Sequence, residues 1–154
     1  MIRSRDAYDA AIDALHVDTA EEYKPGHLGA GLTWCNLFLH NATKALDCAI
    51  PFIKANAQVA WLASIEGAAQ GWRELKGDDS RLEAQRRADA GYPTVAVWEN
   101  PAGLDSHGHV AMVVPGVPWL KVVVTIAQAG AHNFRHAGLG NGFGNYPVRF
   151  FTHG

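Results

Sequence analysis

The chain has 154 residues, of which 48% are hydrophobic and 18% are charged, and its formal net charge is −2. This length suits a single domain spanning residues 1–154, and the composition excludes a disordered chain. The balanced charge lacks the clustered basic surface of a nucleic-acid binder, and no apolar run is long enough for membrane insertion.

Helical patterns dominate the first half of the chain. Ser4 is a suitable N-cap for a first helix, and several glycines and a proline predict a loop over residues 21–32. Thr33 is the predicted N-cap of a second helix, which covers about residues 33–47. The same periodicity predicts further helices over 55–70 and 79–90.

After residue 91 the pattern changes to short runs of valine and other strand-forming residues. Strands are predicted over 94–98, 109–114, 121–127 and 148–152, with a glycine-rich loop over 138–145. Helices followed by strands favour an α+β fold, in which N-terminal helices pack on an antiparallel C-terminal sheet of about residues 94–152.

Cys35 lies in the first turn of the predicted second helix, where backbone N–H groups lack partners and the helix dipole is positive. This position lowers the pKa of a thiol and favours a nucleophilic thiolate, and the N–H groups could stabilise an oxyanion. The alternative is a small side chain in the core, because free cysteines are commonly buried.

The second cysteine, Cys48, lies at the opposite end of the same helix, where the dipole opposes a thiolate. We therefore expect Cys48 to belong to the core. A disulfide with Cys35 is excluded, because thirteen helical residues at about 1.5 Å each separate the two cysteines by about 20 Å.

A cysteine nucleophile needs a base, and histidine is the usual one. Among the eight histidines, His109 is distinctive because it opens the strand sequence GHVAMVV directly after Gly108, which leaves room beside the ring. Sheet hydrogen bonds would hold it in place. The alternative is a histidine at a strand edge that contacts only solvent.

The base in turn needs a polar group that fixes its tautomer. On the next predicted strand, alternation places Gln128 on the same face as Val124 and Ile126, at the end of an apolar row. Gln128 is therefore the favoured third residue, with Asn133 and His132 as substitutes. The alternative is that Gln128 is the first residue of the following loop.

The segments TWCNLF, GYPTVAVWENPAG, GHVAMVVP and TIAQAG resemble the CHAP and NlpC/P60 group of papain-like cysteine peptidases and amidases. The resemblance covers roughly residues 31–130, and FGNYPVRFFTH resembles the closing strand of such a domain. It implies a papain-like fold and hydrolysis of an amide bond in peptidoglycan, with no metal or other cofactor. In this resemblance Cys35 is the nucleophile, His109 the general base and Gln128 the polar residue that orients it.

The chain departs from this group in two respects. The third position is more often Glu, Asn or His than Gln. The group also commonly places a Tyr or Gln before the nucleophile to help hold the oxyanion, and Tyr23 is the candidate here. Asn133 is a second candidate for contact with the oxyanion or the substrate.

The charged N-terminus lacks the apolar segment of a signal peptide, so we expect synthesis in the cytoplasm. A hydrolase of this kind would reach the cell wall after holin-type release, as a phage endolysin, or through secretion machinery, as an antibacterial effector. We expect a monomer with peptidoglycan as its partner. Glycines within 26–31 and 138–144 are expected to let a branched sugar-peptide approach the backbone closely.

Three alternatives differ in chemistry. A cysteine peptidase or deamidase acting on a protein would use the same fold and residues. A catalytically silent binding module would need neither Cys35 nor His109. A metal site containing His107 and His109 is disfavoured, because the HGH spacing in a loop suits two ligands of one ion poorly.

Overall fold

The structure is a computed structural model that describes residues 2–103 and 106–154. Over these residues the chain forms six α-helices, one short 3-10 helix and six strands. The helices are α1 (Arg5–Asp13), the 3-10 helix η1 (Glu21–Tyr23), α2 (Cys35–Ala45), α3 (Ala55–Leu62), α4 (Ile65–Ala69), α5 (Ser80–Asp89) and α6 (Leu139–Phe143). The strands are β1 (Trp72–Leu75), β2 (Thr94–Trp98), β3 (His109–Val113), β4 (Thr125–Gln128), β5 (Phe134–Gly138) and β6 (Arg149–His153).

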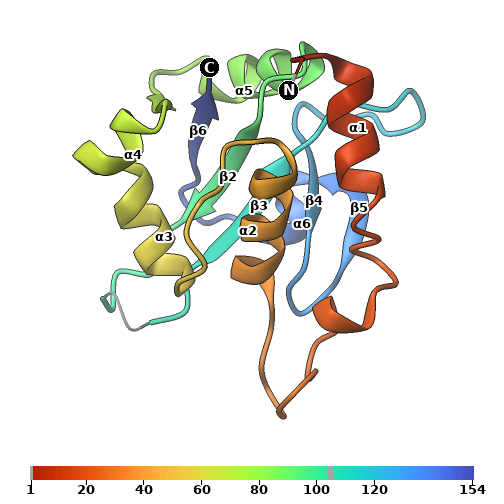
Figure 1. Cartoon of the computed structure of the whole chain (residues 1–154), viewed down its shortest axis with the longest axis vertical. Coiled ribbons are helices and arrows are strands. Elements are labelled where there is room, and N and C mark those ends of the chain that lie inside the picture. The colour runs from red at the N-terminus through yellow and green to blue at the C-terminus, as the bar shows by residue number, and fades with distance from the viewer. Residues whose placement is uncertain (1, 104–105) are drawn as a thin grey trace.

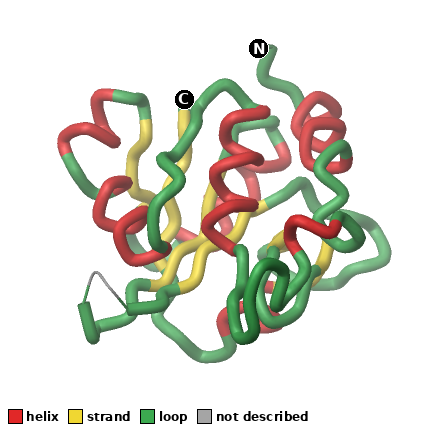
Figure 2. Tube along the Cα trace, turned by 60° about the horizontal axis from the view of Figure 1, so that its bottom comes forward, coloured by secondary structure: helices red, strands yellow, loops and turns green. Residues whose placement is uncertain are grey.

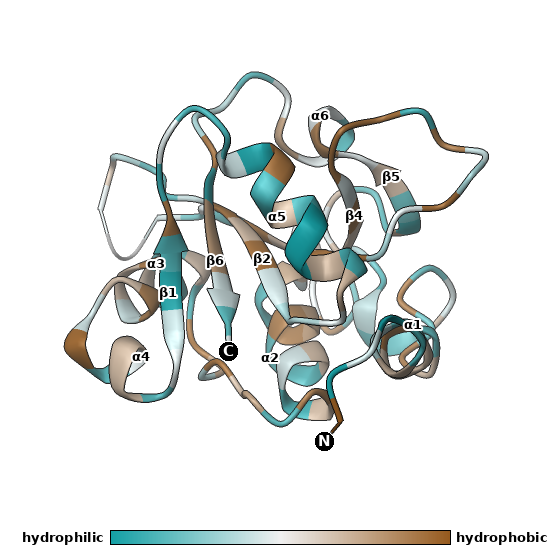
Figure 3. Ribbon diagram, turned by 90° about the horizontal axis from the view of Figure 1, so that it is seen from above, coloured by the Kyte–Doolittle hydropathy of each residue, from teal (hydrophilic) through white to brown (hydrophobic). Residues whose placement is uncertain are grey.

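All of these strands join one sheet in the order β1-β6-β2-β3-β4-β5, and each neighbouring pair is antiparallel. The α+β class and the antiparallel sheet predicted from the sequence are confirmed. Helices cover both faces of the sheet, with α2 and α3 on one face and α5 and α6 on the other (Figures 1 and 3). The buried side chains between these layers form one continuous core.

Loops gather at the end of the molecule where α2 begins, which Figure 2 brings toward the viewer. The strand β3 also begins near this end (Figure 1). The two residues that the sequence singles out, Cys35 and His109, are the first residues of α2 and β3. The fold therefore brings both to the same end of the molecule.

The first helix follows its prediction. The Ser4 hydroxyl caps α1 by accepting a hydrogen bond from the Ala7 N–H at 3.1 Å. Tyr8 and Ile12 are one turn apart and both are buried. The Tyr8 hydroxyl donates to the Val113 carbonyl and accepts from the Thr94 N–H at 3.3 Å, so it ties α1 to both β2 and β3.

The second helix begins one residue later than predicted. Its N-cap is Trp34 rather than Thr33, and no side chain caps it. The Trp34 indole N–H instead donates to the His27 carbonyl at 3.1 Å, which holds the preceding loop against the helix start. The Thr33 prediction is wrong, but Cys35 remains in the first turn.

The helix predicted over 55–70 is two helices, α3 and α4. The chain turns at Ala63, and the Ser64 hydroxyl then caps α4 by accepting from the Gly67 N–H at 3.2 Å. Gly67 lies so close to the Trp61 carbonyl that a Cβ would overlap it. A serine cap and this close approach therefore override the continuous helical periodicity.

Besides the short η1, which lies within the predicted loop 21–32, three elements were not predicted. β1 carries two charged residues and forms one edge of the sheet by pairing only with β6. β5 forms the other edge, and α6 replaces the first part of the glycine-rich loop predicted over 138–145. Edge strands and glycine-rich helices have weak sequence signals, because neither needs the apolar pattern of a buried element.

The strand predicted over 121–127 is shorter and later. Only Thr125–Gln128 pairs in the sheet, whereas Val122 and Val123 are 42% and 55% exposed. Gln128 is the last residue of β4, so the alternative that placed it in the following loop is wrong. The closing strand predicted over 148–152 is present as β6.

Replacement of Tyr8 tests the link between α1 and the central strands. Tyr8→Phe leaves the buried Val113 carbonyl without this donor, so we expect it to lower the free energy of unfolding by about 1–3 kcal/mol. Urea denaturation followed by circular dichroism measures the change. Tyr146→Phe is the matched control, because Tyr146 is 53% exposed, and its change should stay within about 0.5 kcal/mol. Equal losses in both variants would contradict the role of Tyr8.

Candidate active site

Cys35 is the first residue of α2, and only 7% of its surface is exposed. The backbone N–H of Val110, near the start of β3, lies close enough to the thiol to lower its pKa. Within β3, only Met112 and Val113 pair with β4. The first residues of β3 therefore extend beyond the part of the strand that is paired with β4. The Cys35 sulfur therefore lies beside the residue that follows His109, at the open end of β3.

Burial raises the pKa of the Cys35 thiol, and the backbone N–H groups of Val110, Asn36 and Cys35 oppose this effect. The lowered pKa expected at a helix start is therefore wrong, because the lost hydration of the thiolate outweighs the nearby N–H groups. The thiol is protonated near neutral pH and needs a base to become a nucleophile.

Of the first four N–H groups of α2, two have hydrogen-bond acceptors and two do not. The Leu37 N–H donates to the Asn36 side-chain oxygen at 3.0 Å, and the Phe38 N–H donates to the Trp34 carbonyl at 3.0 Å. The N–H groups of Cys35 and Asn36 instead lower the pKa of the Cys35 thiol. Preorganised donors beside a nucleophile can stabilise an oxyanion that forms on the attacked carbonyl.

The predicted contact between His109 and Gln128 is present. His109 Nε2 lies 2.7 Å from Gln128 Oε1, and Gln128 Nε2 donates to the His132 carbonyl at 2.9 Å. The carbonyl accepts only, so it orients the Gln128 amide with its oxygen toward the imidazole. An amide oxygen also accepts only, so Nε2 of His109 carries the proton and Nδ1 has the free lone pair that a base requires.

Neighbouring backbone confines this pair. A Cβ on Gly142 of α6 would overlap Gln128 Oε1, and a Cβ on Gly130 would lie 3.3 Å from Cε1 of His109. The Phe143 ring lies over the imidazole, with ring centroids 4.7 Å apart. Burial lowers the pKa of His109, and the hydrogen bond with Gln128 partly opposes this, so His109 is neutral near pH 7.

The described residues contain no direct hydrogen bond between Cys35 and His109. The alternation of β3 places His109 on the same face as Thr94 and Thr152, where α5 packs, whereas α2 lies on the opposite face. The Cys35 sulfur and the His109 imidazole thus lie on opposite faces of the sheet, at the start of β3. Proton transfer between them therefore requires that the complex with substrate bring the two groups together.

The two predicted contacts for the oxyanion or substrate have structural partners. Tyr23 is fully buried, and its hydroxyl accepts a hydrogen bond from Asn41 at 2.8 Å, nearly two turns along α2 from Cys35. Asn133 donates to the Tyr23 carbonyl at 2.5 Å and accepts from the Gly130 N–H at 2.9 Å. Both residues therefore brace the loops around His109 rather than contact the thiol.

Asn56 was not singled out from the sequence. This buried residue of α3 donates to the carbonyls of Asn100 and Gly103 at 2.9 and 2.5 Å and accepts from the Asn100 N–H at 2.8 Å. A Cβ on Gly108 would overlap the Asn56 amide, so the space that Gly108 leaves is filled by Asn56. The only sequence signal is an amide at a buried position of an apolar helix.

Metal binding has no supporting cluster. Within residues 2–103 and 106–154, no group of three His, Cys, Asp or Glu side chains is arranged to hold a metal ion. His109 also uses Nε2 to contact Gln128, which leaves one ring nitrogen for any ligand.

Within the residues that the structure describes, no helix has the length and apolar character needed to span a membrane.

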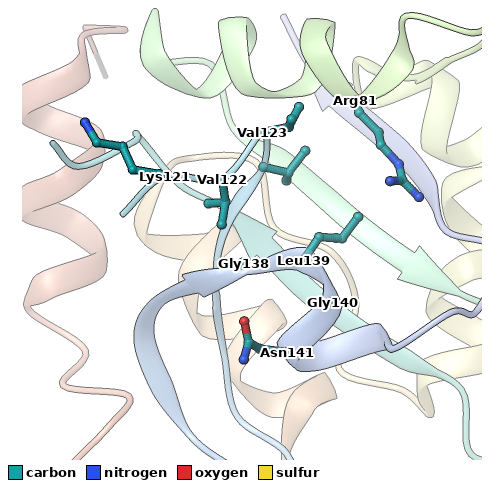
Figure 4. Close-up of a pocket in the computed structure, with 9 residues that line it drawn as sticks. Arg81, Lys121, Val122, Val123, Gly138, Leu139, Gly140 and Asn141 are labelled. Atoms are coloured by element: carbon teal, nitrogen blue, oxygen red, sulfur yellow. The ribbon is translucent and has the colours of Figure 1, made fainter. Parts of the chain in front are cut away.

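A surface pocket of about 400 Å³ has none of Cys35, His109 and Gln128 in its lining. Figure 4 shows the residues that do line it. Its walls come from the segment before β4, from the start of α6 and from Arg81 of α5. Val124 lines this pocket, at the opposite end of β4 from Gln128. This pocket is therefore separate from Cys35, His109 and Gln128.

No protein-family model matches this chain, and no curated protein matches it. Function is therefore inferred from the chemistry of the residues at the start of β3.

Substitution of Gln128 tests the tautomer of His109. Gln128→Leu removes the acceptor for Nε2–H, so we expect the pKa of His109 to fall further below its ordinary value. Gln128→Glu places a carboxylate there and should raise it. An NMR titration of the His109 ring measures both changes, and shifts in the same direction for the two variants would rule out the assigned contact.

The pH dependence of alkylation tests the state of the thiol. Because burial raises the pKa of Cys35, its reaction with iodoacetamide should accelerate steadily from about pH 6 to about pH 9. Burial raises the pKa of Cys48 to about 12, so Cys48 should react more slowly, and Cys48→Ala isolates Cys35. A rate that is already constant near pH 6 would instead show a preformed thiolate.

Proposed function

We propose that this protein is a papain-like cysteine hydrolase that cuts an amide bond in peptidoglycan. The observation that carries the proposal is the His109–Gln128 hydrogen bond at 2.7 Å, formed beside the strand residue whose N–H lies close to the Cys35 thiol. A helix-start cysteine, a strand-start histidine and an amide on the next strand match the order and placement in the CHAP and NlpC/P60 group. The peptidoglycan substrate comes from that resemblance.

The reaction proceeds by acyl transfer. As the Cys35 sulfur attacks the carbonyl carbon, its proton moves to Nδ1 of His109, and the N–H groups of Cys35 and Asn36 stabilise the oxyanion. The C–N bond then breaks, and the departing amine takes the proton from Nδ1. Water attacks the resulting thioester, gives one proton to Nδ1, and the released sulfur recovers that proton.

Gln128 restricts proton exchange by His109 to one ring nitrogen. When Nδ1 gains a proton, the imidazolium is stabilised by the hydrogen bond from Nε2–H to the Gln128 oxygen. The amide cannot remove the Nε2 proton, because it is not basic. His109 therefore exchanges protons only through Nδ1, the nitrogen assigned to the thiol and the leaving amine.

Digestion of purified peptidoglycan tests the function. Wild-type protein should release soluble fragments whose masses identify the bond, and Cys35→Ala should lower the rate by at least about 10³-fold because the nucleophile is lost. Cys48→Ala is the matched control and should retain the wild-type rate, since Cys48 lies beyond the opposite end of α2.

The outcomes separate substrate from mechanism. If wild type releases no fragment but cleaves a protein amide in a Cys35-dependent way, the chemistry stands and peptidoglycan is the wrong substrate. If Cys35→Ala retains full activity on peptidoglycan, the proposed nucleophile is wrong.

A further inference from the structure

The described chain begins and ends on the same side of the molecule (Figures 1 and 3). Arg3 and His153 bring the two ends into direct contact, because Arg3 Nη2 lies 3.1 Å from His153 Nδ1. The other ring nitrogen, Nε2, lies 2.8 Å from the Gln70 carbonyl oxygen, in the turn between α4 and β1. The imidazole of His153 therefore links three segments that are far apart in the sequence.

The two partners of this ring determine its protonation state. A guanidinium group only donates hydrogen bonds, and a carbonyl oxygen only accepts them. Nδ1 of His153 must therefore accept from Arg3 with its lone pair, while Nε2 carries the hydrogen and donates to the Gln70 carbonyl. An imidazolium ring has a hydrogen on both nitrogens, so it cannot accept from Arg3. The observed contacts thus require a neutral ring.

The neighbouring residues hold the ring in this position. Gly71 adopts a φ of 95°, and a Cβ there would lie 2.9 Å from Nε2 of His153, so the missing side chain makes room for the ring. Trp72 of β1 is the cross-strand partner of His153, and the two rings meet edge to face with centroids 5.3 Å apart. Neither Gly71 nor Trp72 carries a charge that would stabilise an imidazolium.

Arg3 is the charged group that acts on the imidazole of His153. Burial lowers the pKa of His153, the hydrogen bond with the Gln70 carbonyl opposes this effect, and the Arg3 guanidinium lowers the pKa further. From α5, Arg87 instead binds the Thr152 hydroxyl and the Gly154 carbonyl. Within the part of the chain that the structure describes, no carboxylate pairs with His153 to compensate a positive charge on the ring.

Arg3 also holds the end of the helix that begins with Cys35. Its Nη1 donates to the Leu46 carbonyl at 2.7 Å, and Leu46 is the C-cap of α2. One guanidinium therefore joins the N-terminal segment to the end of α2 and, through His153, to the last residue of β6.

We propose that His153 is an acid-sensitive latch that releases the N-terminal segment when a proton from water binds to its Nδ1. The new N–H replaces the lone pair and faces the Arg3 guanidinium, so the hydrogen bond is lost and two positive charges repel. Ile2 and Arg3 then detach from β6 and from the end of α2, whereas the bond from Nε2–H to the Gln70 carbonyl remains. The latch is independent of the proposed hydrolase, since it needs neither substrate nor Cys35.

NMR spectroscopy of the wild-type protein tests the latch directly. The ring of His153 should titrate below the ordinary histidine pKa of about 6.5. As it gains its proton, we expect the heteronuclear NOE of the Arg3 amide to fall with the same midpoint, because the segment becomes mobile on the timescale of picoseconds to nanoseconds. An Arg3 amide that stays ordered throughout the titration of His153 would overturn the proposal.

His153→Gln provides a latch that cannot titrate. An amide at position 153 can accept from Arg3 through its oxygen and donate to the Gln70 carbonyl through its nitrogen, so the Arg3 amide should stay ordered in acid. His107→Gln is the matched control, because His107 is exposed, and it should keep the wild-type transition. Retention of the transition in His153→Gln, or its loss in His107→Gln, would contradict the assignment to His153.

Arg3→Met tests the same contact from the other partner. Without the guanidinium, Nδ1 of His153 no longer faces a positive charge, so we expect the pKa of His153 to rise toward its ordinary value. An unchanged or lower pKa of His153 in this variant would show that Arg3 does not hold the ring neutral.

Unfolding at different pH values measures the same linkage. The fold requires a neutral ring, so the stabilisation is present above the unfolded pKa of about 6.5 and is lost as the pH falls below it. From about pH 7 to about pH 5, the unfolding equilibrium constant of the wild type should rise several-fold more than that of His153→Gln, with a limit of about thirtyfold. Equal acid sensitivity of the two proteins would overturn the latch.

Discussion

Antiparallel hydrogen bonds hold β2 and β3 in a register that runs from Thr94 opposite Val113 to Trp98 opposite His109. α2 packs on one face of these strands, and α5 and α6 cover the other face. A slip by one residue would turn His109 to the opposite face, away from Phe143 and Gln128, and would expose the valines of the core. The register that buries the core therefore also builds the site.

The sequence predicts the parts of this site that depend on strong local patterns. Cys35 at a helix start and His109 at a strand start follow from periodicity, and Gln128 follows from alternation along β4. The edge strands β1 and β5 escape prediction because their side chains are only partly buried, so their apolar pattern is weak. Their pairing depends on partners far along the chain.

Other features could not be predicted because they depend on tertiary contacts. The pKa of Cys35 is set by burial under the sheet as well as by its helix, and no local pattern reports that burial. Tyr23 and Asn133 bond to each other across more than one hundred residues, which turns two candidate ligands into loop supports. Gly142 of α6 serves internal packing, because its missing side chain makes room for Gln128.

The contact between Gly142 and Gln128 has an evolutionary consequence. The Gln128 oxygen occupies the space that any side chain at position 142 would need, so each position limits what the other can become. A shorter amide such as asparagine at position 128 would withdraw from that space and release the constraint on position 142. Among descendants of this chain, the two positions should therefore vary together, although they lie fourteen positions apart in the sequence.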